Sequence, residues 1–295
     1  MFRLLSALIA LVLLSGGVSS AAGQQPAPNN CLGATPTIVG TAGDETLAGT
    51  PGRDVINGLQ GNDTIDGGAG PDVICGGDGD DNLTGNTGLD AMSGGLGNDR
   101  IDGGAGGGFN GVVYVEAPGA VTVDLTAGTA TGSTGSDTLV NINTVLGSRK
   151  GDVVKGGPGQ DLLLGLGGGD TLVGAGGPDI LAGLGGNDSL DGGPGFDYAD
   201  YTDSPFRIQA NLTRGTALGD GRDRLRRMEG VIGGARGDKL IGNNRDNELF
   251  GDRGNDTLEG RGGRDLLHGG RGRDHLDGGA GRDRCRAGEV LVRCP

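Results

Sequence analysis

The chain contains few of the large side chains that normally fill a protein core. Among its 295 residues there is no tryptophan, and there are only five Phe and three Tyr. Aromatic side chains supply much of the buried area in ordinary domains. Their scarcity excludes a conventional globular core and leaves either disorder or a fold built from small residues.

Catalytic signatures and positive charge are also scarce. The only histidines are His268 and His275, and the sequence has neither G-x-S-x-G nor H-E-x-x-H. Both histidines stand at outward strand positions, where a solvated side chain is a simpler expectation than a ligand or a base. The 24 Lys and Arg against 38 Asp and Glu give a formal net charge of −14, which repels nucleic acid and attracts cations. We therefore predict that the protein is not an enzyme and does not bind nucleic acid.

Long apolar runs are absent except at the N-terminus. Arg3 precedes the apolar run Leu4–Leu14, and small residues follow it around Ala21. This pattern predicts a secretory signal peptide over residues 1–22, because the run is too short to span a bilayer. An uncleaved anchor is the alternative. We predict an extracellular protein with no transmembrane segment, and association with the cell surface stays open.

Glycine, by contrast, is abundant and periodic. The chain has 69 glycines, far above the roughly 7% that is usual. Cut into nines from Gly40, it reads GTAGDETLA, GTPGRDVIN, GLQGNDTID and GGAGPDVIC, and the frame holds over residues 40–102, 147–200 and 233–286. Nineteen copies all begin with Gly, and the sixth position is Asp in every copy except those with Glu45 and Asn247. This regular nine-residue spacing of Gly and Asp favours an ordered fold over the disorder that low hydrophobicity would allow.

Each copy divides into a turn and a short strand. The first six residues permit a tight turn because glycine tolerates positive φ. In the last three, the middle residue, such as Ile56 or Ile65, is expected to point inward while its neighbours point outward. One inward aliphatic per nine residues cannot form a core alone, but stacked copies form a thin continuous one.

These copies resemble the RTX nonapeptide G-G-x-G-x-D-x-U-x, in which U is a large aliphatic residue. The resemblance implies an all-β fold, a right-handed parallel β-roll with two nonapeptides per coil and calcium between turns 18 residues apart. Backbone carbonyls of the glycine turns would complete the oxygen shell that calcium prefers. The resemblance implies as calcium ligands the sixth-position residues Asp54, Asp63, Asp72, Asp81, Asp90, Asp99, Asp152, Asp161, Asp170, Asp179, Asp188, Asp197, Asp238, Asp256, Asp265, Asp274 and Asp283.

A metal-free explanation of the aspartate column is turn chemistry, because Asp can accept a hydrogen bond from its own turn. That explanation does not account for aspartate on both edges through so many coils, where the charges would repel. We therefore predict several bound Ca²⁺ ions and expect magnesium to replace them poorly.

Two spacers separate the three blocks and resemble each other. Residues 103–146 and 201–232 align through a tyrosine, a proline and the triplets Asp137-Thr138-Leu139 and Asp223-Arg224-Leu225. We expect the spacers to continue the stack as irregular coils, and a separate ligand-binding module is the alternative. Residues 23–39 are predicted as a linker and N-terminal cap, and residues 287–295 as a C-terminal cap.

Four cysteines lie near the two ends of the repeat array. A secreted chain with four cysteines suggests disulfides, and three pairings are possible. We favour Cys31–Cys75 and Cys285–Cys294, because each would hold one terminus to its own end of the array. An N-terminal signal and a cysteine-bearing C-terminal cap favour general secretion over the type I export of many RTX proteins.

The sequence therefore predicts a secreted, calcium-binding β-roll that folds on binding extracellular calcium and has a structural or surface-associated role as a monomer. The alternative is a calcium-dependent adhesion module that binds cell-wall polymer or polysaccharide. Arginines of the third block, such as Arg264 and Arg273, could serve that alternative or pair with neighbouring carboxylates.

Overall fold

The computed structural model describes residues 30–105 and 108–294. The predicted signal peptide and the first part of the predicted linker lie outside the described residues. The described chain consists of short strands and turns, and none of it forms a helix of the length and apolarity that crossing a membrane requires. Contacts divide the chain into two compact units, the first comprising residues up to Gly119 together with Ala127–Val145, and the second comprising Ala120–Thr126 and the residues from Leu146 onward.

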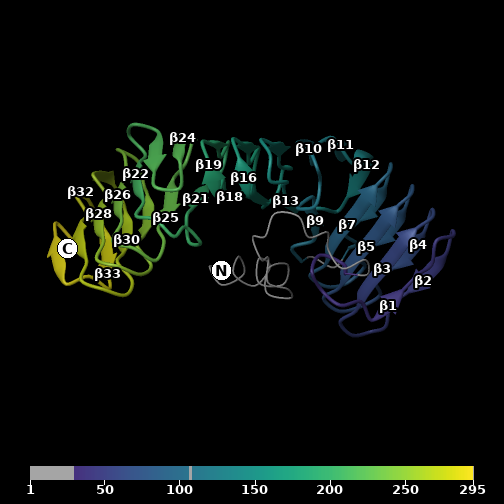
Figure 1. The fold of residues 1–295 in the computed structure, drawn as a ribbon. Helices are drawn as coiled ribbons and strands as arrows, with labels where there is room; N and C mark the ends of the chain where they lie inside the picture. The colour runs from purple at the N-terminus through teal and green to yellow at the C-terminus, as the bar shows by residue number, and fades with distance from the viewer. Residues whose placement is uncertain (1–29, 106–107, 295) are drawn as a thin grey trace. The chain divides into compact units, whose positions relative to one another are not determined.

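The first unit has two ladders of mainly parallel strands, coloured purple to blue in Figure 1. One ladder has the order β1 (Ile38–Val39), β3 (Val55–Gln60), β5 (Val73–Asp78), β7 (Ala91–Leu96) and β9 (Gly111–Val113). The other has the order β2 (Thr46–Ala48), β4 (Thr64–Asp66), β6 (Asn82–Thr84), β8 (Arg100–Asp102), β12 (Gly135–Val140) and β11 (Thr129–Gly132), the last antiparallel.

The second unit repeats this arrangement, and its strands run from teal to yellow in Figure 1. Its first ladder contains β15 (Leu162–Leu164), β18 (Ile180–Ala182), β21 (Tyr198–Asp200), β25 (Gly230–Ile232), β27 (Glu248–Phe250), β30 (Leu266–His268) and β33 (Arg284–Arg286). Its second contains β10 (Val121–Asp124), β14 (Val153–Lys155), β17 (Thr171–Val173), β20 (Ser189–Asp191), β24 (Arg222–Arg226), β23 (Thr216–Leu218), β22 (Gln209–Asn211), β26 (Lys239–Ile241), β28 (Thr257–Glu259), β31 (His275–Asp277) and β34 (Val290–Val292).

Five further strands complete the described structure. Two small ladders of turn residues pair β16 (Gly167–Gly168) with β19 (Gly185–Gly186) and β29 (Gly262–Gly263) with β32 (Ala280–Gly281). Strand β13 (Thr144–Leu146) spans the sequence boundary between the two units.

The core of each unit is the column of eighth-position side chains. Ile56 pairs in register with Ile74, and Ile65 with Leu83, so identical positions stack directly on one another. These side chains are 0–1% exposed, as are Leu172 and Leu258 in the second unit. Each unit is therefore a parallel β-roll, and the predicted fold class is confirmed.

The spacers contribute strands to the same ladders. In the second spacer, β24 pairs in parallel with β20, β23 and β22 follow antiparallel, and β22 pairs in parallel with β26. Leu225 is thereby in register with Leu190. The opposite ladder has the single strand β25 between β21 and β27. In the first spacer, β12 extends β8 with Leu139 opposite Ile101.

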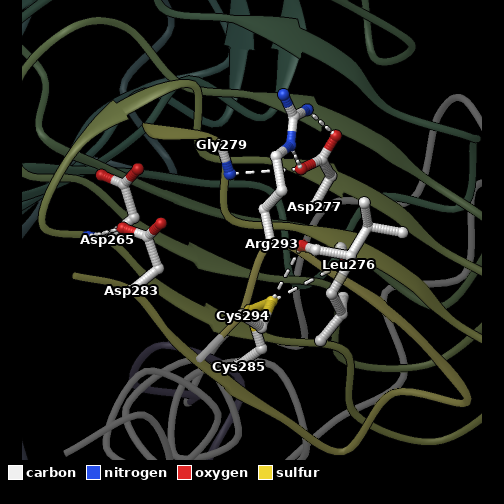
Figure 2. Close-up of a disulfide and its surroundings, with 9 residues drawn as sticks. Asp265, Leu276, Asp277, Gly279, Asp283, Cys285, Arg293 and Cys294 are labelled. Atoms are coloured by element: carbon white, nitrogen blue, oxygen red, sulfur yellow. Dashed lines mark hydrogen bonds and ion pairs between the residues drawn. A yellow bond between two sulfur atoms is a disulfide. The ribbon is translucent and has the colours of Figure 1, made fainter. Parts of the chain in front are cut away.

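Both favoured disulfides are present. Cys31 bonds Cys75, whose neighbour Ile74 points into the core, so the N-terminal cap lies on the outer side of β5. Cys285 bonds Cys294 at the other end (Figure 2). There, β34 adds a last strand to β31, and Arg293 forms an ion pair with Asp277.

Candidate metal sites

The sixth-position aspartates form buried columns along both edges of the roll in each unit. All seventeen side chains are at most 5% exposed. The backbone N–H of Asp54 donates to Oδ1 of Asp72 at 2.8 Å, and that of Asp63 donates to Oδ1 of Asp81 at 2.7 Å. The same bond joins the other predicted pairs, namely Asp72–Asp90, Asp81–Asp99, Asp152–Asp170, Asp161–Asp179, Asp170–Asp188, Asp179–Asp197, Asp238–Asp256, Asp256–Asp274 and Asp265–Asp283.

The second carboxylate oxygen is unpaired in most of these turns. Buried polar atoms nearly always have a partner, and an unpaired buried carboxylate oxygen is costly. Its repetition at one position of the repeat is the feature that a row of cations would explain. Within the described chain, Oδ2 is buried without a hydrogen-bond partner in Asp63, Asp72, Asp81, Asp90, Asp99, Asp170, Asp179, Asp188, Asp197, Asp256, Asp265, Asp274 and Asp283.

Backbone carbonyls of neighbouring coils lie close to the same turns. A Cβ built on Gly76 would lie closer than 3.0 Å both to Oδ2 of Asp81 and to the carbonyl oxygen of Gly94 in the next coil. From the preceding coil, the carbonyl oxygen of Gly61 approaches Gly79 equally closely. The described residues contain no cluster of three or more His, Cys, Asp or Glu side chains suited to a metal. A cation here would therefore depend on carbonyl as well as carboxylate oxygens, which suits calcium.

Replacing Gly76 by Ala is expected to weaken calcium binding and to destabilise the fold. The added methyl group would occupy the space shared by the Asp81 carboxylate and the Gly94 carbonyl, and overpacking of this kind costs about 1–3 kcal/mol. Gly43→Ala is the matched control, because nothing lies within 4 Å of a Cβ at that glycine. Calcium titration and urea unfolding of both variants measure the effect, and equal behaviour would contradict it.

The turns occur in two forms. In a closed turn, the second-position N–H donates to the sixth-position side chain, as Thr50 does to Oδ2 of Asp54 at 2.6 Å and Ser148 to Oδ2 of Asp152 at 2.6 Å. In an open turn, the second residue instead has positive φ, as at Leu59 (φ 80°), and Oδ2 is unpaired. Closed turns are the first two of each block and contain Glu45, Asp54, Asp152, Asp161, Asp238 and Asn247.

This difference divides the seventeen predicted ligands into two groups. Thirteen lie in open turns, whereas Asp54, Asp152, Asp161 and Asp238 already have Oδ2 occupied by their own turn. The metal-free hydrogen bond from a turn to its own aspartate therefore occurs at the start of each block, where no RTX turn precedes on the same edge. The residue type at the second position of the repeat does not predict whether a turn is closed or open, because Gly157 is in a closed turn and Leu166 is in an open one.

Burial raises the pKa of many aspartates in the open turns, Asp63 and Asp197 among them. Desolvation is the largest cause, the backbone hydrogen bond opposes it, and for many of them neighbouring aspartates in the column raise the pKa further. The pKa is raised to about 8 for Asp179, to about 7 for Asp99, Asp170 and Asp256, and to about 6 for Asp72, Asp81, Asp90, Asp188 and Asp265.

Three spacer carboxylates that sequence analysis did not predict as ligands join the columns. The N–H of Asp99 donates to Oδ1 of Asp137 at 3.2 Å, and that of Asp188 to Oδ1 of Asp223 at 3.0 Å. The N–H of Asp197 donates to Oε2 of Glu229 at 3.2 Å. For the two aspartates, the sequence contains the stretches G-S-D-T-L and G-R-D-R-L, which match the second half of the nonapeptide. They were missed because neither stretch falls in the nine-residue frame of the blocks.

The histidines and two arginines of the third block have other partners or face solvent. His268 packs its ring 6.2 Å from that of Phe250, and His275 is exposed. Arg264 pairs with Asp246 at 3.6 Å and Arg273 with Glu289 at 3.0 Å, both on the surface. Pairing with nearby carboxylates therefore accounts for these two arginines, although exposed pairs of this kind add little stability.

A protein-family model matches much of the chain. The family model of the RTX calcium-binding nonapeptide repeat, which spans four copies, matches residues 39–74, 76–109, 141–172, 164–199, 232–267 and 259–289. These segments cover more than half of the chain. A search of curated proteins found no match.

Proposed function

Because this chain belongs to the RTX calcium-binding nonapeptide-repeat family, we propose that it is a secreted protein that folds into a β-roll when it binds extracellular calcium. The observation that carries the proposal is the row of buried carboxylate oxygens without partners in the thirteen open turns. Calcium would supply positive charge and accept several oxygen ligands between successive turns. The aspartates of the open turns and the adjacent glycine carbonyls would hold it.

The energetics explain why the metal would be needed for folding. Two carboxylates on coils about 4.8 Å apart repel by about 3.5 kcal/mol at an effective dielectric constant of 20. One buried Ile or Leu per repeat contributes only about 1.5–3 kcal/mol, against the conformational entropy of nine residues. A ligand that binds only the folded form adds about 2.7 kcal/mol per site at a hundred times its dissociation constant. Many such sites would decide the balance.

Calcium titration of the chain without its predicted signal peptide tests the proposal. Far-ultraviolet circular dichroism is expected to show little β structure in chelator and a cooperative rise as calcium is added. Magnesium at equal concentration is expected to give a much smaller rise, because it prefers a tight octahedral shell and retains its water. A chain that has full β structure in chelator, or that does not respond to calcium, would contradict the proposal.

The proposed role is non-catalytic and structural or surface-associated, outside the cell. Support comes from the two disulfides, which are typical of oxidising compartments, and from the predicted signal peptide. Rigid rolls stabilised by calcium would form only after export, since calcium is scarce in the cytosol.

A second candidate function is adhesion to an acidic polymer, and the second spacer favours it. Arg222, Arg224 and Arg226 alternate along β24 with their side chains exposed on the outer face. A groove beside them, over β22, β23 and β26, is lined by Arg214, Lys239 and Arg261 among others. Sedimentation with acidic polysaccharide, with calcium or chelator, tests this candidate. Binding that survives replacement of the three β24 arginines by Ser would contradict it.

A further inference from the structure

We propose that the calcium column extends into both spacers, at a site between the turns of Asp99 and Asp137 and at another between the turns of Asp188 and Asp223. This inference rests on the proposed function, because it assumes that the open turns of the blocks bind calcium. Both spacer turns lie outside the segments that match the family model. They qualify as sites because they stack on the blocks as an RTX turn does.

In the first spacer, residues 132–137 reproduce three hydrogen bonds of a stacked RTX turn. The N–H of Gly97 donates to the carbonyl of Thr134 at 2.8 Å, as that of Gly79 does to Leu96 at 2.8 Å one coil earlier. The N–H of Asp99 reaches Oδ1 of Asp137, and the N–H of Thr138 returns to the carbonyl of Asp99 at 2.7 Å. The geometry around Asp137 is thus that of an internal coil.

The second spacer repeats the arrangement with residues 218–223. The N–H of Gly186 donates to the carbonyl of Asp220 at 3.1 Å, and the N–H of Arg224 donates to the carbonyl of Asp188 at 2.8 Å. Gly221 has φ 131°, and a Cβ there would collide with the carbonyl of Gly186. The equivalent Gly135 has φ 139° and faces the carbonyl of Gly97 in the same way.

On the block side of each site lies a buried aspartate with an unpartnered oxygen. Asp99 and Asp188 are each 2% exposed, and Oδ2 of each has no hydrogen-bond partner. Each Oδ2 lies beside its first-position glycine, Gly94 or Gly183, as Oδ2 of Asp81 lies beside Gly76. Asp99 and Asp188 are thus in the same unpaired state as the aspartates inside the blocks, with a carboxylate on the following coil.

Tyrosine hydroxyls end the columns at these points. The hydroxyl of Tyr114 donates to Oδ2 of Asp137 at 2.9 Å, and that of Tyr201 donates to Oδ2 of Asp223 at 2.9 Å. These bonds occupy the oxygen that an open turn leaves unpaired. The next strands, β11 and β23, run antiparallel, so no further turn stacks there. Asp137 and Asp223 would therefore each contribute to one ion, on the block side only.

Calcium stoichiometry of the secreted chain tests the inference. Asp137→Asn and Asp223→Asn each keep the oxygen that accepts the N–H but remove the charge, and each is expected to bind one ion fewer by equilibrium dialysis. The double variant is expected to bind two fewer. Asp80→Asn is the matched control, because it makes the same charge change at a fifth position that is Asn62 and Asn98 in neighbouring coils. Its stoichiometry is expected to equal that of the unchanged chain.

Terbium luminescence gives a readout that does not depend on the folding of the Asp137 and Asp223 variants. Tyr114, Tyr198 and Tyr201 are the three tyrosines of the chain. In a Tyr198→Phe background, Tb³⁺ in the two spacer sites is expected to emit strongly on tyrosine excitation. Absence of this emission, or equal stoichiometry of the Asp137, Asp223 and Asp80 variants, would overturn the inference. Failure of the unchanged chain to bind calcium would instead overturn the proposed function.

Discussion

Lowering the pH of the calcium-free chain from about 8 to about 4 is expected to raise its β-sheet content. Nine aspartates of the open turns, including Asp81, Asp170 and Asp179, have folded-state pKa values raised from 3.8 to between about 6 and about 8 by burial. A group with a raised folded-state pKa binds its proton more tightly in the folded chain, so it opposes folding while ionised and ceases to do so once protonated. Stability should therefore rise as the pH falls from about 8 towards 3.8.

Calcium reverses the sign of this dependence. Protons compete with calcium for the same carboxylates, so in limiting calcium the midpoint of folding should move to higher calcium concentration as the pH falls through about 8 to about 6. Circular dichroism of the chain in chelator and in calcium across this range measures both effects. A calcium-free chain as unstructured at pH 4 as at pH 8 would show that the carboxylates are not what prevents folding.

Replacing Asp81 by Ala is expected to destabilise the calcium-loaded protein by about 5 kcal/mol. Asp81 lies between two open turns, those of Asp63 and Asp99, so it borders a proposed cation site on each side. Losing two sites, each contributing about 2.7 kcal/mol at a hundredfold excess over the dissociation constant, gives this magnitude. The N–H of Asp63 would also lose its acceptor. Urea unfolding in calcium, with the calcium midpoint of folding, measures the change.

Two comparisons identify the cause of that loss. Asp80→Asn changes the charge of the adjacent exposed residue and should leave stability nearly unaltered. Asp54→Ala removes a carboxylate from a closed turn, where Oδ2 is bonded to Thr50, and should cost less than Asp81→Ala. If chelator abolishes none of the difference between Asp81→Ala and the unchanged chain, the carboxylate acts through packing and not through calcium.

Much of the fold followed from the nine-residue period. Successive side chains of a strand point to opposite faces. The aliphatic residue in the middle of each three-residue strand was therefore expected to point inward, and Ile56, Ile65 and Leu83 are buried. A coil of two repeats placed Asp63 beneath Asp81. The cysteines near the two ends of the array could each reach a partner at their own end, and the structure has those bonds. These features depend on short-range geometry repeated many times, which a sequence displays directly.

The state of each turn depended on contacts that a local motif does not contain. Asp54 and Asp63 occupy equal positions in the repeat, yet Asp54 has its Oδ2 bonded within a closed turn, whereas Oδ2 of Asp63 is unpaired because a coil precedes it on the same edge. Asp137 joined the column although its turn lies outside the nine-residue frame of the blocks, and the hydroxyl of Tyr114, 23 residues away in the sequence, donates to it. The nine-residue period of the sequence thus defined the coil. Stacking against the neighbouring coil decided which carboxylates have an unpaired oxygen, because only packing between coils removes water from those oxygens.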